Sequence, residues 1–300
     1  MALTMVEAAK LTQDMMLRGV IETIVSESQV LNLLPWMGVT GTALTYNQEA
    51  TLGTAAFYAV GGTWAEDTPT FTQKTSVLRI MGGDADVDSF LQQTYNNMND
   101  LEAAVIAAKA KATGRKFSDG FFNGDNAADV NSFDGLHKLI PAAQRRKANG
   151  DNANGGALTL DDLDVAIDLV KPGKPEALFM SKRSRRKLKG LRRAQSNVLD
   201  VGIDQFGARV DFYDGIPIYA DDFILDNRTV GTSVGVCSTI YCVQFGFQRG
   251  VMGLDNGGVQ VERIGALETK DARRTRIKWY TSLAMFRDIA CSVVEGITAA

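Results

Sequence analysis

Apolar and polar residues repeat with two different periods along this chain, and each period predicts a different kind of element. Between residues 85 and 122, large apolar residues recur every three to four positions among Ala, Lys and Glu, which predicts one long helix. Residues 258–268 and 271–285 carry alternating charge and predict two long strands of an elongated hairpin. Near the start, Thr4 and Glu7 have the spacing of a capping box, and a loosely helical apolar stripe follows them.

The segment from about residue 38 to residue 80 is rich in β-branched, aromatic and turn residues. It predicts a long two-stranded excursion with its turn around Val60–Thr63. The aromatic residues Phe57, Tyr58 and Trp64 flank that turn. Because an isolated hairpin of this length is marginal in water, we expect another surface to cover it.

A stretch rich in Asn, Asp and Gly at residues 148–156 predicts a domain boundary. Thr159 then has the position of an N-cap for a helix with an acidic first turn. Ala177–Met180 is an entirely apolar run typical of a short buried strand. Ser181 has the cap position of a second helix that extends to Gln195. A helix, strand, helix unit is therefore expected after the boundary.

The second of these helices concentrates positive charge, which is costly without counter-charges. Two interpretations are open: the helix contacts phosphates or an acidic neighbouring chain, or it is a solvated face balanced by acids of the preceding helix. We favour an acidic protein neighbour or the solvated face over DNA. The preceding helix supplies Asp161, Asp162, Asp164 and Asp168. The basic residues are Lys182, Arg183, Arg185, Arg186, Lys187, Lys189, Arg192 and Arg193.

Composition bounds the class of protein. The chain has 300 residues, 45% of them hydrophobic, which is enough for one substantial core or two modest ones. A net charge of -3 provides no overall basic field for wrapping a duplex. Three cysteines without a CxxC pair do not describe a secreted disulfide framework, and no stretch is apolar over the ~18 residues that a membrane span requires. An intracellular protein with reduced thiols, outside any membrane, is expected.

The sequence contains no recognisable catalytic motif. The single histidine, His137, lies in an expected loop without a Ser or Cys nucleophile motif nearby. No Walker-type or GxGxxG loop occurs, and three cysteines with one histidine make no metal-ligand set. The loops at 125–135 and 150–155 depart from EF-hand spacing and predict turns. We therefore expect no catalytic residue, cofactor or metal site.

Four segments follow one another along the chain: KFSDGFFNGD with FDGL soon after it, LTLDDLDVAIDLV, PEALFMSKRSRRKLKGLR and GIPIYADDFI. In this order and spacing they resemble the major capsid proteins of tailed bacteriophages, which have the Hong Kong 97-type fold. The resemblance covers essentially the whole chain and implies an α+β fold. The parts that it implies are an N-terminal arm at 1–37, a hairpin called the E-loop at 38–82, a P-domain with a long spine helix at 83–148, an A-domain at 149–254, further P-domain strands at 255–285 and a closing A-domain strand at 286–300.

The resemblance implies a structural role and no enzymatic one. Such a protein assembles with itself as hexamers and pentamers into the icosahedral head that encloses double-stranded DNA, which it meets at the inner surface. Its other expected partners are a portal protein and, where present, separate scaffolding and decoration proteins. The expected location is the virion, assembled in the host bacterial cytoplasm. Two alternatives stay open: an encapsulin-type nanocompartment shell that loads protein cargo, and a soluble α+β enzyme with an unrecognised site.

The chain begins directly at the arm, whereas many relatives carry a scaffolding segment before it. Either a separate scaffolding protein assists, or the sequence is a processed form or needs no scaffold. The only lysine of the E-loop, Lys74, lies far from its tip, so we expect no autocatalytic crosslink.

The resemblance also implies contacts between subunits. Phe57, Tyr58 and Trp64 are expected to lie over the spine helix of an adjacent subunit. The charged turn of the C-terminal hairpin is expected to form ion pairs at three-fold positions, with a solvated turn as the alternative. Its residues are Glu268, Asp271, Arg273 and Arg274.

Overall fold

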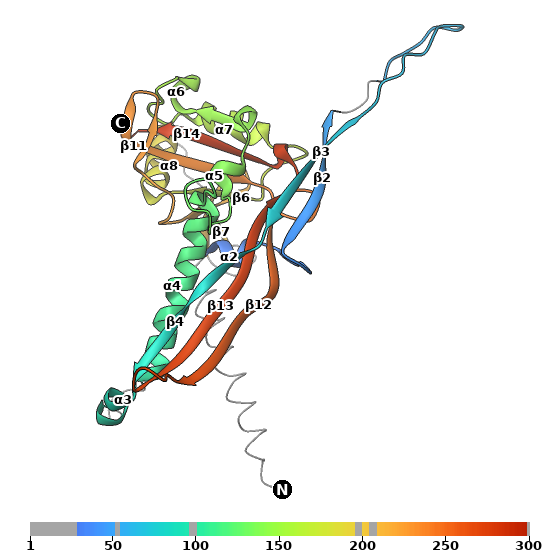
Figure 1. The fold of residues 1–300 in the computed structure, drawn as a ribbon. Helices are drawn as coiled ribbons and strands as arrows, with labels where there is room; N and C mark the ends of the chain where they lie inside the picture. Colours follow the sequence, from blue (N-terminus) through green and yellow to red (C-terminus); the bar gives the residue numbers. More distant parts are fainter. Residues whose placement is uncertain (1–28, 52–54, 96–100, 196–199, 204–208, 299–300) are drawn as a thin grey trace.

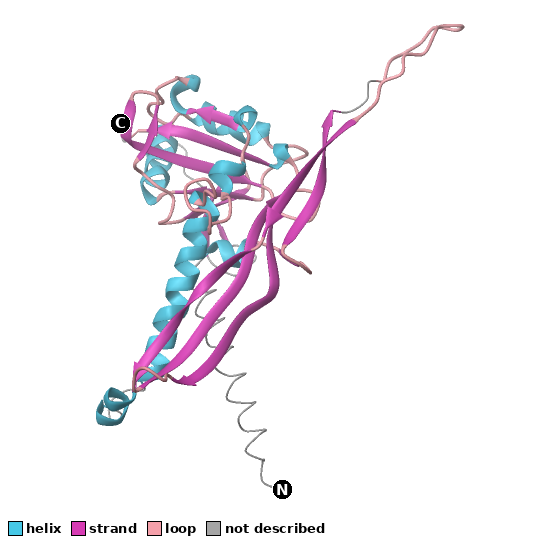
Figure 2. Ribbon diagram, viewed as in Figure 1, coloured by secondary structure: helices cyan, strands magenta, loops and turns pink. Residues whose placement is uncertain are grey.

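The computed structural model describes residues 29–51, 55–95, 101–195, 200–203 and 209–298. The described chain has three parts: a rounded body, an elongated part in which one long helix runs beside a long sheet, and a thin hairpin that projects away from both (Figures 1 and 2). The N-terminal helix predicted from Thr4 falls outside the described residues.

The body is built on an eight-stranded mixed sheet. Its strand β6 is buried on both faces, because Leu178 and Met180 pack with helices α7 (Leu160–Leu169) and α8 (Lys182–Ala194), whereas Phe179 packs on the opposite side. A strand covered on both faces has no polar alternation, which explains its entirely apolar sequence. In spatial order the strands are β5 (Arg145–Lys147), β14 (Cys291–Ile297), β11 (Ser233–Val243), β6 (Ala177–Met180), β9 (Ile216–Ala220), β8 (Arg209–Tyr213) and β7 (Asp200–Ile203), with β10 (Arg228–Val230) beside β11.

Helices α7 and α8 begin at the predicted caps. The Thr159 hydroxyl accepts a hydrogen bond from the backbone N–H of Asp162, and Ser181 caps α8 in the same way. The carboxylate of Asp162 is fully buried and accepts from the backbone N–H groups of Asn149 and Gly150. These two residues have positive φ and belong to the short helix α6 (Ala148–Asp151). The acid therefore joins the start of α7 to the turn before it.

The elongated part pairs helix α4 (Leu101–Asn123) with a four-stranded sheet. One face of α4 is buried, with Ile106, Phe117 and Phe121 at helical spacing. At the centre of the contact the ring of Phe117 stacks on Trp279, with centroids 5.0 Å apart, and the ring of Trp36 lies 5.3 Å away. The strands in order are β1 (Trp36–Gly38), β12 (Val251–Ala266), β13 (Ala272–Met285) and β4 (Arg79–Asp88).

The projecting hairpin consists of β2 (Ala43–Thr51) and β3 (Thr70–Val77), which pair antiparallel as a sheet of their own. The two-stranded excursion predicted from the sequence is thus confirmed. The short helix α2 (Gln29–Leu33) precedes β1. The two long C-terminal strands are also confirmed as β12 and β13, although β12 begins earlier than predicted.

The helix predicted for residues 85–122 is wrong over its first part. Strand β4 extends to Asp88, helix α3 (Ser89–Tyr95) follows, and α4 begins at Leu101. Acidic and buried apolar residues alternate in the segment DADVD, which is the period of a strand with one covered face. Because this alternation is short and borders a longer helical pattern, the strand is predicted from the sequence as part of the helix.

Two other boundaries differ from the sequence prediction by a few residues. Strand β5 precedes the predicted boundary at 149, yet it pairs in parallel with β14 of the body sheet. Residues 79–82, predicted to belong to the hairpin, pair with β13 as the start of β4. His137 lies in the short helix α5 (Leu136–Leu139) and not in a loop. These short elements are set by partners that are distant in sequence, so their local signals are weak.

We predict that Phe117→Ala lowers the free energy of unfolding of the unassembled subunit by about 3–5 kcal/mol, because it empties the aromatic contact between α4 and the four-stranded sheet. The urea midpoint, followed by circular dichroism at unchanged m-value, measures the change. Phe90→Ala is the control: that ring is 67% exposed, and we expect a change within about 0.5 kcal/mol. Equal effects of the two substitutions would contradict this packing.

Candidate functional site

Side chains of both hairpin strands fix the base of the hairpin to the rest of the chain. The Tyr46 hydroxyl and the Gln48 amide donate to the carbonyl of Met285, at 3.0 and 2.9 Å. On the other strand, Lys74 pairs with Asp288, with Nζ and Oδ1 2.6 Å apart. Lys74 is therefore held at the hairpin base, and the absence of a crosslink through it stays a prediction.

The distal end of the hairpin presents an exposed aromatic cluster. The chain turns at residues 59–62, where Gly61 has a φ of 84°. Tyr58 stacks on Trp64 with ring centroids 4.4 Å apart, and Phe57 is fully exposed. Trp64 itself remains 78% exposed. The structure thus brings Tyr58 and Trp64 into contact and leaves Phe57, next to Tyr58 in the chain, fully exposed, and this exposure suits the three residues to burial on another chain.

A ladder of ion pairs crosses one face of the four-stranded sheet. Ile277 and Trp279 of β13 are buried, and the residues that alternate with them carry the ladder. Hydrogen bonds from the arginines of β13 hold the pKa of Asp84 and of Asp86 below the usual range. The pairs are Arg276–Asp84, Arg274–Asp86 and Lys278–Glu262, with closest N–O distances of 2.7, 2.6 and 2.9 Å.

The four residues predicted for three-fold contacts do not share one environment. Arg274 is engaged within the chain, since its guanidinium donates twice to Asp86 at 2.6 Å. Glu268, Asp271 and Arg273 are exposed and make no ion pair with any residue that the structure describes. These three charges remain candidates for contact with a neighbouring subunit, whereas Arg274 links β13 to β4 within the sheet.

Helix α8 carries all eight predicted basic residues, but the acids of α7 that were predicted to balance them form no ion pair with them. Asp162 is buried at the start of α7, and Asp164 accepts from the Tyr213 hydroxyl at 2.6 Å. The acids that form ion pairs with α8 come after β7 in the sequence. They do not lie on a helix, so helical spacing could not predict them. The observed pairs are Lys182–Asp222 at 2.7 Å, Arg183–Asp226 at 3.4 Å and Lys189–Asp211 at 2.7 Å.

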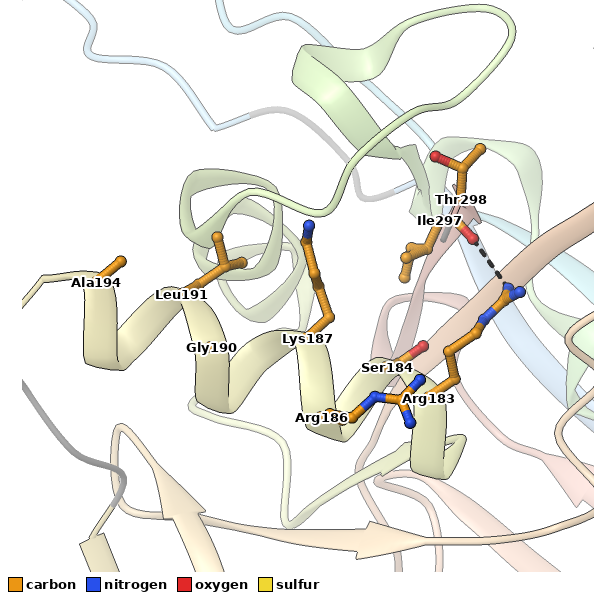
Figure 3. A pocket seen from close by; sticks show the side chains of 9 residues that line it. All are labelled: Arg183, Ser184, Arg186, Lys187, Gly190, Leu191, Ala194, Ile297 and Thr298. Carbon is orange, nitrogen blue, oxygen red and sulfur yellow. Dashed lines mark hydrogen bonds between the residues drawn. The ribbon is translucent and has the colours of Figure 1, made fainter. Parts of the chain in front are cut away.

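Three cations of α8, Arg183 among them, border a groove on one flank of the helix, against the end of β14 (Figure 3). The groove has a volume of about 400 Å³. Arg183 spans it to donate to the carbonyl of Ile297 at 3.3 Å, and Lys187 is directed into it beside Leu191 (Figure 3). The side chain of Arg186 also lines the groove. This cationic lining offers positive charge to a partner surface.

No protein-family model and no curated protein matches the sequence. Solved structures match over nearly the whole chain. A chain of the holo-SrpI encapsulin complex from Synechococcus elongatus has a TM-score of 0.68 at 18% identity, covering 90% of this chain and 88% of that one. A chain from Microbacterium phage Oxtober96 has a TM-score of 0.65 at 17% identity, covering 90% of both. The capsid of a native GTA particle has a TM-score of 0.64 at 14% identity, covering 91% of both.

A capsid and an encapsulin therefore share the architecture described above. This chain has the Hong Kong 97-type capsid fold. The α+β class and the fold predicted from the sequence are confirmed. At these identities the similarity concerns the fold alone and assigns no individual contact residue.

Several reactive residue types occupy structural positions in the Hong Kong 97-type fold of this chain. Burial, with Arg228 and Arg145 nearby, lowers the pKa of His137 to about 3, so this imidazole is neutral. Burial raises the pKa of the Cys242 and Cys291 thiols to about 12 each. In the described ranges, no three His, Cys, Asp or Glu side chains are grouped as a metal site. None of the described helices is long and apolar enough to span a membrane.

We predict that Asp84→Asn combined with Asp86→Asn destabilises the subunit at neutral pH and that the deficit shrinks in acid. Arginine partners hold the folded-state pKa of both carboxyls below 3.8. Their ionised forms therefore stabilise the fold above the unfolded-state pKa, and this contribution is lost as the pH falls through the folded-state pKa. Denaturant midpoints of both proteins from about pH 6 to about pH 2.5 measure the difference.

The control for this ladder is Glu66→Gln on the exposed hairpin, for which we expect no change in midpoint at any of these pH values. A deficit of the ladder variant that stays constant across the pH range would show that the carboxylate charges do not act through the arginines.

Proposed function

We propose that this chain is the major capsid protein of a tailed bacteriophage, which assembles into an icosahedral head around double-stranded DNA. The observation that carries the proposal is the projecting hairpin of a capsid-like fold (Figure 1), whose tip exposes aromatic side chains. Phe57 is fully exposed and Trp64 is 78% exposed in the single chain, and an adjacent subunit supplies the missing surface. The role is structural, with no enzymatic step.

The parts of the Hong Kong 97-type fold are assigned as follows in this proposal. Helix α4 is the spine helix of the P-domain, together with the four-stranded sheet. The body sheet with α7 and α8 is the A-domain, and β2 and β3 form the E-loop. The arm precedes β1. Subunits form the hexamers and pentamers of the virion, which is assembled in the host bacterial cytoplasm. The other partners are a portal protein and, where present, separate scaffolding and decoration proteins. The DNA lies at the inner surface.

The energetics of the proposed assembly follow from the exposed tip. Burying one large aromatic side chain contributes roughly 1.5–3 kcal/mol, so Phe57, Tyr58 and Trp64 together can hold a hairpin on a neighbouring spine helix. The ion pairs proposed for Glu268, Asp271 and Arg273 at three-fold positions contribute less, about 0.2–1 kcal/mol each, because these side chains are exposed. Each contact is modest, and the closed shell repeats it many times.

The second candidate function is an encapsulin-type nanocompartment shell. The similarity to the holo-SrpI encapsulin complex favours it. The contents of particles isolated from the native source separate the two functions. Double-stranded DNA protected from nuclease supports the capsid, and an enclosed protein cargo without such DNA supports the nanocompartment.

We predict that the purified protein, expressed alone or with its candidate scaffolding partner, forms uniform shells or rings of five and six subunits. Negative-stain electron microscopy with size-exclusion chromatography measures this. A protein that stays strictly monomeric in both preparations would refute the assembly and favour the soluble enzyme.

We further predict that Trp64→Ala reduces the yield of assembled particles about tenfold, since losing one buried aromatic contact of roughly 1.5–3 kcal/mol corresponds to at least that factor. The melting temperature of the unassembled subunit should stay unchanged, because Trp64 is 78% exposed and its ring stacks on Tyr58 of the same hairpin. Sedimentation and calorimetry measure the two quantities. Trp64→Phe, which keeps a ring able to stack on Tyr58, is the control and should assemble nearly as well.

A further inference from the structure

Charge is unevenly neutralised on the two helices that cover one face of the body sheet. Five cations of α8 form no ion pair with any described residue, although three others of that helix do. Two of the five, Arg186 and Arg193, are exposed and lie seven residues apart on one side of the helix; we name them the basic face of α8. On α7, Asp161 and Asp168 are exposed and likewise form no ion pair within the described ranges; we name them the acidic face of α7.

These two faces lie in one layer. Residues of both helices belong to the same buried cluster, so both helices pack on the same side of the sheet. Helix α7 contacts β14 and β5, and its Asp164 also accepts from Tyr213 on β8. Helix α8 contacts β11, its Lys189 reaches Asp211 on β8, and its Arg183 reaches the end of β14. The acidic and basic faces therefore belong to neighbouring helices over the same strands.

We propose that the basic face of α8 is a docking surface for a second copy of this chain and receives the acidic face of α7 of that copy. The proposal rests on the proposed function, since it supplies a contact within rings of subunits. Opposite charges meet when α8 of one copy lies against α7 of the next. Repeated by rotation, such a head-to-tail contact closes a ring, which is the arrangement that the rings of the proposed function require.

Charge also favours a second copy over nucleic acid as the occupant. The exposed carboxylates of Asp161 and Asp168 in the same layer repel the phosphates of a duplex. The net charge of -3 adds no general attraction for a polyanion. A copy of this chain offers carboxylates at α7 and presents the matching cations at its own α8.

The test is a charge swap in the full chain. Arg186→Glu with Arg193→Glu reverses the basic face, and Asp161→Lys with Asp168→Lys reverses the acidic face. Each pair opposes like charges at every contact, and we expect the fraction of protein in rings or shells to fall at least about tenfold. All four substitutions in one chain restore opposite charges, and we expect assembly to recover to within about threefold of the wild type.

Matched variants separate charge from misfolding. Arg249→Glu reverses an exposed cation in the turn between β11 and β12 and should assemble like the wild type. Circular dichroism and melting temperature establish that each unassembled subunit is folded. Asp161 lies in the first turn of α7, where a cation opposes the helix dipole. If that pair fails to fold, Asp168→Lys alone, combined with the Arg186→Glu and Arg193→Glu pair, tests the same swap.

The outcomes distinguish this inference from the proposed function. Wild-type protein that forms no rings or shells would refute both. Wild-type protein that assembles while the reversed basic face assembles equally well would overturn only the docking surface. So would a fourfold variant that is folded yet as defective as either pair. Shells of the reversed basic face that form normally but lose their nuclease-protected DNA would identify nucleic acid as the occupant and overturn the proposal in the same way.

Discussion

A single aromatic cluster on the C-terminal half of α4 joins the two sheets, and the rest of the subunit depends on it. Phe117 stacks on Trp279 and packs at a tilt against Trp36, both in the four-stranded sheet. One turn further along, Phe122 contacts Tyr241 of the body sheet, with centroids 5.5 Å apart, and Phe179 at 5.6 Å. Because both sheets use one helix as their shared core, the position of the elongated part relative to the body is set by close packing. The hairpin inherits this geometry through its base at Met285 and Asp288.

The periphery has the opposite character to this core. The hairpin tip exposes aromatic rings, the turn after β12 exposes unpaired charges, and α8 exposes cations. Each feature is unfavourable in a protein that acts alone, because exposed apolar rings and concentrated like charge both carry a free-energy cost. All three occur on a fold shared with a capsid and an encapsulin. The assembly of copies that we propose would offset all of these costs together, and the proposal therefore assigns the features to contacts between subunits.

Much of the fold could be predicted from sequence because its signals are local. The caps at Thr159 and Ser181, the apolar run of β6 and the turn of the hairpin each depend on residues that are neighbours in the chain. Strand β4 could not be distinguished from the long helix by local signals. Its acids pair with arginines of β13 that lie almost two hundred residues later in the sequence. The counter-charges of α8 escaped prediction for the same reason, since Asp211, Asp222 and Asp226 reach it only through the tertiary fold.

The division between core and periphery also determines how the subunit responds to its surroundings. Contacts around Phe117 are apolar and buried, so moderate changes in salt leave them nearly untouched. Exposed charge contacts between copies are screened within about 8 Å at physiological ionic strength, and each contributes about 1 kcal/mol at most. In the proposed assembly, rising salt therefore weakens the charge-dependent contacts long before it affects folding. The apolar hairpin contact of that assembly is not screened by salt, so under the proposal the aromatic tip sets how strongly neighbours hold one another and the charged faces set which surfaces meet.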